Sequence, residues 1–253
     1  MELIRSCKRG LVLVLVGIAA TGCGGGGVQP QQQPAGAPRT PGTGALETGA
    51  AMLQDVTPVK KIAVYLVGFH PMKDNPSVQM EAHHYCNQVN EDFAQCVLFD
   101  GNTEKANMNG LEFIISEKLF ESLPQDERKY WHPHNYEILS GQLVGPGLPD
   151  VAEKELMRRK MNSYGKTWHV WMDGDKLPMG DPHLAWSFNR DGEARPGLAE
   201  ERDRKLRIDS GEKRRDRADL SSLARPQSGV DALRSAFPDA KGAPEGVRDR
   251  GQQ

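Results

Sequence analysis

The aromatic residues are confined to the middle of this 253-residue chain. Fifteen of the sixteen Phe, Trp and Tyr residues lie between Tyr65 and Phe188, and Phe237 is the only one outside that span. Aromatic side chains supply much of the apolar area that a folded core buries. The distribution therefore predicts one domain of ordinary size, over residues 59–193, between flanking segments that cannot build a core of their own.

Both flanking segments have compositions typical of unfolded chains. Residues 23–58 are rich in Gly, Pro and Gln and contain no aromatic residue, which predicts a flexible tether. Residues 194–253 mix bases and acids without an apolar stripe at helical spacing, which predicts a charged, disordered tail. The alternative is a tail whose basic clusters bind nucleic acid or anionic lipid. Because acids interrupt those clusters, we expect no nucleic-acid partner.

The first 22 residues have the layout of a bacterial lipoprotein signal peptide. Basic residues precede an apolar run over 11–20, which is too short to cross a bilayer as a helix. The small residues before Cys23 resemble a lipobox, although Ala20 stands where such boxes usually carry leucine. We expect Cys23 to carry acyl chains such as palmitate and to anchor the protein to a membrane. The alternative is an ordinary cleaved signal with an incidental cysteine.

The cell envelope is the expected location. Gly24 follows the cysteine, where some lipoproteins retained at the inner membrane carry aspartate, so the outer membrane is favoured. With Cys7 in the signal and Cys23 acylated, Cys86 and Cys96 remain in the domain. These two could close a disulfide over a short loop, or they could be buried thiols, since pairing requires two strands in register.

Short apolar segments alternate with helix starts and predict an α+β domain with a mainly antiparallel sheet. A helix is expected after Ser116, another after Ser122, and a third where Pro149 supplies a proline at the helix start. Strands are expected over residues 62–69, 80–89, 93–99, 111–116, 135–147, 166–172 and 183–188.

All seven histidines fall inside the expected domain. Alternation along the strand over 80–89 places His84 on its apolar face, so His84 should point inward, whereas His83 should point to the other side. His132 and His134 are separated by Pro133, which biases His132 toward extended backbone. Two imidazoles spaced in this way lie on one side of the chain and can bind a single ion.

A transition-metal site is therefore one interpretation of the histidines. A divalent ion would be held by His84, His132, His134 and His169, with Glu81, Glu112 or Glu137 completing its shell or serving as a general base. The other interpretation is that these histidines are structural and bond to carbonyls or tyrosines. Since the chain contains no HExxH, CxxC, GxSxG, P-loop or GxGxxG motif, no catalytic residue is assigned.

Four segments, in order, resemble the oil body-associated protein family: "VQMEAHHYCNQVNEDFAQCVLFD", "GLEFIISEKLFESLP", "WHPHNYEILSGQLVGPG" and "YGKTWHVWMDGDKLPMGDPHLAWSF". The resemblance covers residues 62–190. It implies an α+β domain of unknown biochemical activity, which in plants is found with lipid stores and has a role in lipid body stability. It implies no catalytic mechanism and no assigned metal ligand. Because plant members work in a reducing cytoplasm, the resemblance favours free thiols at Cys86 and Cys96.

Together these features predict a membrane-tethered, non-enzymatic lipoprotein whose α+β domain binds a lipid, a protein partner or a small ligand. The alternative is a histidine-cluster metal-binding protein or a metal-dependent enzyme. Because an exported bacterial protein meets no seed oil body, location at a lipid droplet is not inferred from the resemblance.

Overall fold

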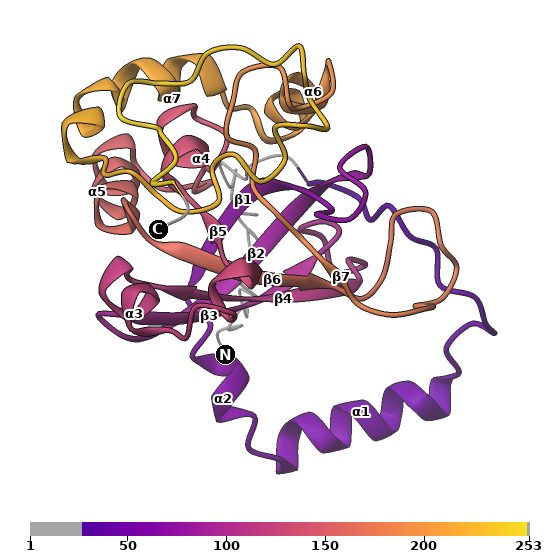
Figure 1. Cartoon of the computed structure of the whole chain (residues 1–253). Helices are drawn as coiled ribbons and strands as arrows, with labels where there is room; N and C mark the ends of the chain where they lie inside the picture. Colours follow the sequence, from indigo (N-terminus) through magenta and orange to yellow (C-terminus); the bar gives the residue numbers. More distant parts are fainter. Residues whose placement is uncertain (1–26, 252–253) are drawn as a thin grey trace, which may run out of the picture.

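The computed structural model describes residues 27–251, and within them it has the predicted α+β architecture with an antiparallel sheet. The predicted signal peptide and Cys23 lie outside the described residues. The strands run in the order β1-β2-β3-β4-β6-β5, and β7 also pairs with β6 (Figure 1). The strands are β1 (Val64–Pro71), β2 (Gln79–Asn90), β3 (Phe93–Phe99), β4 (Met108–Ile115), β5 (His132–Pro133), β6 (Tyr164–His169) and β7 (His183–Leu184).

The central strands match the expected positions, and β2 and β3 form the expected hairpin. The strand expected over 135–147 is wrong, because that segment begins with the helix α4 (Asn135–Leu139). His134 already has helical backbone angles, and every residue of α4 is buried. A short apolar run that is buried on all sides carries no periodicity, so its sequence cannot distinguish a strand from a helix.

Cys86 and Cys96 form a disulfide, so the expectation of free thiols is wrong. The two residues are directly opposite each other in the β2–β3 ladder, with their Cα atoms 4.0 Å apart. Direct cross-strand neighbours are close enough to bond, and the register that makes them neighbours is not visible in the sequence.

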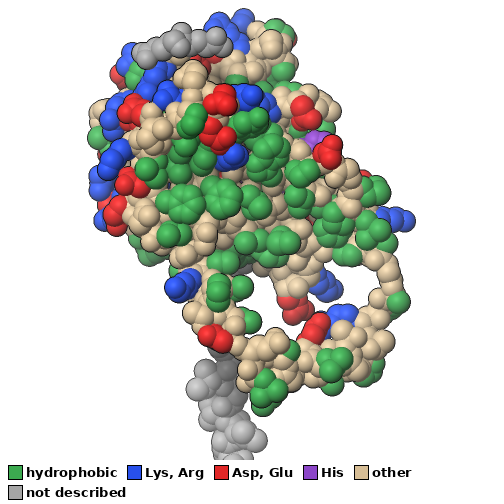
Figure 2. Space-filling model, turned by 60° about the horizontal axis from the view of Figure 1, so that its bottom comes forward, with side chains coloured by type: hydrophobic (Ala, Val, Ile, Leu, Met, Phe, Trp, Pro, Cys, Tyr) green, Lys and Arg blue, Asp and Glu red, His purple; other side chains and the backbone are tan. Residues whose placement is uncertain are grey.

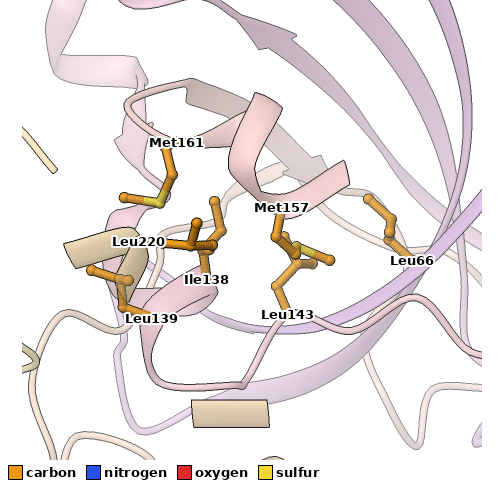
Figure 3. Packing of buried hydrophobic residues seen from close by; sticks show 7 residues of the cluster. All are labelled: Leu66, Ile138, Leu139, Leu143, Met157, Met161 and Leu220. Carbon is orange, nitrogen blue, oxygen red and sulfur yellow. The ribbon is translucent and has the colours of Figure 1, made fainter. Parts of the chain in front are cut away.

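Helices α4 and α5 (Asp150–Lys160) cover the inner face of the sheet, and α3 (Glu117–Ser122) packs against its outer face at the end of β4. The helix expected after Ser116 is α3, where Ser116 Oγ accepts a hydrogen bond from the Leu119 amide. The helix expected after Pro149 is α5. The segment after Ser122 forms no α-helix and ends in a 3₁₀ turn, η1 (Arg128–Tyr130). Figure 3 shows how α4 and α5 meet the sheet in a cluster of Leu66, Ile138, Leu139, Leu143, Met157, Met161 and Leu220.

The structure differs from the disordered tail expected over 194–253. This segment contains α6 (Leu198–Leu206), α7 (Ser210–Asp216) and the 3₁₀ helix η2 (Ala218–Leu223). In Figure 1, α7 lies above α4 and α5, and η2 contacts α4. Leu198, Leu206 and Leu220 are each 3 % exposed. Arg202 and Arg217 are also buried, and they donate hydrogen bonds to backbone carbonyls of the domain. Isolated leucines and carbonyl-binding arginines leave no apolar stripe, which is why the composition indicated disorder.

The described part of the predicted tether also contains structure. Val28 is 1 % exposed and packs with Val67, Val144 and Leu206. The helix α1 (Pro41–Leu53) begins at a Thr40 cap and buries no side chain, and α2 (Thr57–Lys60) follows it. Among the helices of residues 27–251, none has the length and apolar character that a membrane crossing needs.

Candidate metal centre

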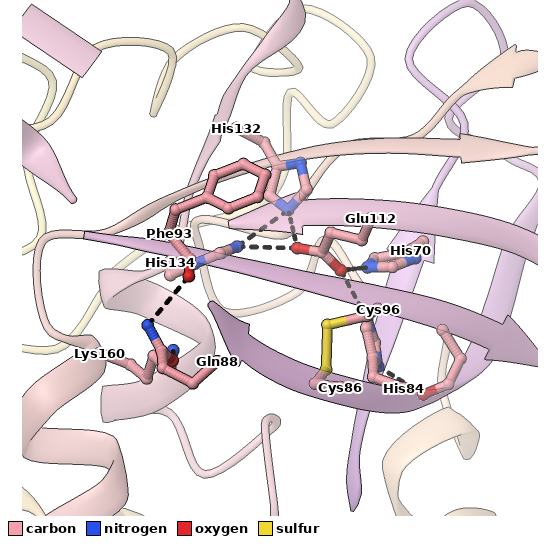
Figure 4. Close-up of a disulfide and its surroundings, with 11 residues drawn as sticks. His70, His84, Cys86, Gln88, Phe93, Cys96, Glu112, His132, His134 and Lys160 are labelled. Carbon is pink, nitrogen blue, oxygen red and sulfur yellow. Dashed lines mark hydrogen bonds and ion pairs between the residues drawn. A yellow bond between two sulfur atoms is a disulfide. The ribbon is translucent and has the colours of Figure 1, made fainter. Parts of the chain in front are cut away.

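Strand alternation gathers five histidines around one glutamate on the inner face of the sheet. Glu112 lies at the middle of β4, opposite Cys96 of β3 and Thr167 of β6. The histidines come from four strands and from the residue before α4, and each of the six side chains belongs to a residue at most 4 % exposed. The cluster consists of His70, His84, Glu112, His132, His134 and His169. Figure 4 shows all of these except His169, with the disulfide beside them.

The two oxygens of Glu112 face different histidines. Oε1 lies 3.2 Å from His134 Nε2 and 3.7 Å from His132 Nε2. Oε2 lies 2.8 Å from His84 Nε2 and 3.9 Å from His70 Nε2. Either oxygen and its two imidazoles are close enough together to share an ion. The carboxylate thus joins two potential ligand sets.

The structure brings three of the four predicted metal ligands, His84, His132 and His134, onto Glu112. His169 does not contact Glu112 directly; its Nε2 lies 3.0 Å from Nδ1 of His70, which in turn faces Glu112. His70 was missed from the sequence. Alternation along the first strand puts His70 on the same face as Leu66, so that signal was available.

The other residues singled out from the sequence lie elsewhere. His83 points to the opposite side of β2, as expected, where its Nδ1 is 2.7 Å from the Tyr65 hydroxyl. Glu81 lies 3.1 Å from His83 Nε2 and takes no part in the cluster. Glu137 does reach the cluster, with its Oε2 4.0 Å from His134 Nε2.

Hydrogen bonds set the tautomer of His134. Ser163 Oγ donates its hydrogen to the Lys160 carbonyl at 2.7 Å, so it must accept from His134 Nδ1 at 2.8 Å. His134 Nδ1 therefore carries a hydrogen, and its other ring nitrogen, Nε2, points toward Glu112 Oε1 and His132 Nε2. Ligating histidines are typically oriented by such a bond from the other ring nitrogen.

Burial keeps three of the imidazoles neutral at physiological pH. Burial and, after it, nearby histidines lower the pKa of His132 to about 3 and that of His169 to about 4. Burial and the charge of His84 also hold the pKa of His70 well below its usual value. Neutral imidazoles retain the lone pair that metal binding requires.

The pKa values of the two buried carboxyl groups, Glu112 and Glu137, are shifted in opposite directions. Burial opposes ionisation of Glu112, but the charge of His84 and hydrogen bonds from His134 and His84 together outweigh it and hold the pKa of Glu112 well below its usual value. Burial and the neighbouring Glu112 raise the pKa of Glu137 well above its usual value. Ionisation is therefore favoured at Glu112 and opposed at Glu137.

A cavity of about 20 Å³ adjoins the cluster. Its walls include His134, Glu137 and Lys160, together with apolar side chains such as Leu143. A space of that size holds about one water molecule. Glu112 and His134 line this space together with His70 and His84, whereas His132 does not. Imidazoles and a carboxylate next to a water-sized space have the composition of a divalent metal site with one open coordination position.

The chain is similar in sequence to several plant proteins. The chain matches a family model described as "Protein of unknown function (DUF1264)" over residues 56–221. It is 37% identical to "Oil body-associated protein 1A" of Zea mays over 203 residues, which cover 79% of this chain and 84% of that protein. It is 40% identical to "Oil body-associated protein 2A" of Arabidopsis thaliana over 174 residues, covering 67% of this chain and 70% of that protein. No solved structure matches the chain.

Proposed function

The chain belongs to the oil body-associated protein family, and on that premise we propose that its domain attaches to a lipid surface through the outer face of its sheet. The observation that carries the proposal is an apolar surface on the side of the sheet opposite to Glu112. We call this surface the outer apolar face. It consists of Tyr85, Phe93, Val97, Phe99, Leu111, Phe113 and Trp168, all of them partly exposed.

The outer apolar face follows from the same alternation that builds the histidine cluster. Leu111 on β4 lies opposite Val97 on β3 and Trp168 on β6, so the three side chains form a row across the sheet. Leu111 is 38 % exposed, and Met108 on the same strand is 57 % exposed. Figure 2, in which the bottom of Figure 1 comes forward, shows hydrophobic side chains gathered over this side.

A lipid surface suits this composition. Exposed apolar area of this kind marks an interaction site, and aromatic rings settle favourably at the boundary between lipid and water. The helix α1 lies on the same side of the sheet in Figures 1 and 2 and adds Leu46 and Leu53, which are 77 % and 88 % exposed. The relatives are named for oil bodies, which are lipid stores.

Attachment in this case is proposed to be reinforced by acyl chains on Cys23, which would hold the domain at the outer membrane as a non-enzymatic lipoprotein. More than one acyl chain gives stable anchoring, and the outer apolar face would add reversible contact. Mass spectrometry of the membrane-extracted protein checks this part. It should find a mature chain that begins at an acylated Cys23, and an unmodified Cys23 would contradict the anchor alone.

The outer face is tested without the anchor. The full chain carrying Cys23→Ser should float with phospholipid-coated triacylglycerol droplets in a density gradient. Leu111→Ser should weaken droplet binding about fivefold, because withdrawing a partly exposed leucine from lipid costs about 1 kcal/mol. Leu223→Ser is the matched control, since Leu223 is 42 % exposed on η2 within the C-terminal helices. Equal flotation of the two variants would rule out the outer face as the contact.

A further inference from the structure

We propose that Glu112 Oε1, His132 Nε2 and His134 Nε2 bind one divalent first-row transition-metal ion, with a fourth coordination position open to the adjoining cavity. The inference concerns the inner face of the sheet and does not depend on attachment of the outer face to lipid. Its evidence is the spacing of the three donor atoms, the space beside Gly165 and the hydrogen bonds around the site.

The three donor atoms are spaced as ligands of one ion. His134 Nε2 is 3.2 Å from Glu112 Oε1 and 3.2 Å from His132 Nε2, and the third side of the triangle is 3.7 Å. Ligands that bond to zinc at about 2.0–2.2 Å are separated from one another by roughly 3.0–3.5 Å. The ligand set therefore needs shifts of only a few tenths of an ångström. The set on Oε2 is less regular, with distances of 2.8 Å and 3.9 Å.

Gly165 provides the space for the ion. A methyl group at position 165 would lie 2.3 Å from Glu112 Oε1, 2.6 Å from His134 Nε2 and 2.7 Å from His132 Cε1. These distances are close to metal–ligand bond lengths, so the glycine keeps a side chain out of the position that an ion would take. Glycine weakens a strand, and its presence inside β6 is explained by this close approach.

The chemistry of the three donor atoms suits a first-row metal ion. Glu112 Oε1 is a carboxyl oxygen, and His132 Nε2 and His134 Nε2 are imidazole nitrogens, so each of the three can bind a cation. Two imidazoles with one carboxylate suit zinc, iron(II), cobalt(II) or manganese(II).

The surroundings orient the ligands. Ser163 fixes the His134 tautomer, and His84 Nε2 holds the far oxygen of Glu112 at 2.8 Å. His84 Nδ1 is 3.1 Å from the Ala82 carbonyl, so both of its ring nitrogens face oxygen atoms, which hold the ring in place. His84 is thus a positioning residue for the carboxylate, and it is not a ligand in this assignment.

The test is metal titration of the full chain carrying Cys23→Ser, purified without a polyhistidine tag and stripped with chelator. Cobalt(II) should bind with a stoichiometry of one and give visible d–d absorption bands, and zinc should displace it. The double variant His132→Ala/His134→Ala should weaken binding at least about 100-fold, beyond the usual effect of changing an orienting residue. His183→Ala is the control, because His183 pairs with Asp74 outside the cluster and should leave binding unchanged.

Gly165→Ala tests the geometry without removing a donor atom. It should abolish the cobalt bands while circular dichroism shows the fold intact. If that variant does not fold, Glu112→Gln tests the same site, since the near-isosteric amide removes the anionic donor and should weaken binding as strongly. The proposal is overturned if the parent chain binds less than about a tenth of an equivalent of each ion, or if the histidine and Glu112→Gln variants bind as the parent does.

Discussion

Single residues determine the chemistry of the inner face. Glu112 faces four histidines, two at each of its oxygens, and burial sets which of the surrounding groups carry charge. His84 lies 2.8 Å from the carboxylate, and burial keeps His70, His132 and His169 neutral. An imidazole that is neutral in the folded chain and protonated in the unfolded chain makes stability depend on pH.

His169 gives a measurable case. Its folded-state pKa of about 4 lies below the usual value of 6.5, so between pH 6.5 and 4 the unfolded state binds the extra proton and stability falls as pH falls. For this one group, the free energy of unfolding of the metal-free protein should drop by about 2 kcal/mol from pH 7 to pH 5. His169→Gln should remove that part of the pH dependence in urea unfolding. The same drop in the variant and the parent would show that His169 is not a neutral buried group.

The sequence predicted part of this site. The spacing of His132 and His134 and the inward position of His84 follow from local backbone geometry, which a sequence contains. That Glu112 is the group they meet depends on the register of β4 against β6 and on the pairing of β5 with β6. Register arises from packing between strands that are distant in sequence, so it had to come from the structure.

At the scale of elements, the C-terminal helices are part of the fold. Leu198, Leu206 and Leu220 fill apolar positions on the domain, and Arg217 donates to the carbonyls of Ile138 and Leu143. Arg217 Nη2 also lies 3.2 Å from the buried carboxylate of Glu153. Removing one partner of such a buried pair leaves an uncompensated charge in the interior.

Ending the chain after residue 193, the boundary predicted from composition, should therefore prevent stable folding. Each buried leucine contributes roughly 1.5–3 kcal/mol, so losing three removes about as much as the whole stability of a typical domain, roughly 5–15 kcal/mol. Thermal unfolding of residues 27–193 should show no cooperative transition, whereas residues 27–251 should show one. A truncated chain that melts cooperatively near the temperature of the longer one would contradict the structural role of α6, α7 and η2.

At the scale of the whole molecule, the predicted α+β class and the antiparallel order of the central strands are confirmed. These rest on the continuous apolar run of β1, which is buried on both faces, and on the short apolar segments of β2 to β4. The limits of the folded region were not predictable in this way. Segments of low apolar content at either end gain order from contacts with the rest of the domain, and composition does not record such contacts.

Leu111 and Glu112 are consecutive residues, yet one belongs to the outer apolar face and the other to the histidine cluster. Inserting or deleting a single residue in β4 before this pair would exchange their sides, sending a carboxylate into the greasy exterior and a leucine among the imidazoles. The two surfaces consequently depend on the same alternation of side chains along β4. A substitution can alter one surface alone, whereas inserting or deleting one residue in this part of β4 would disrupt both.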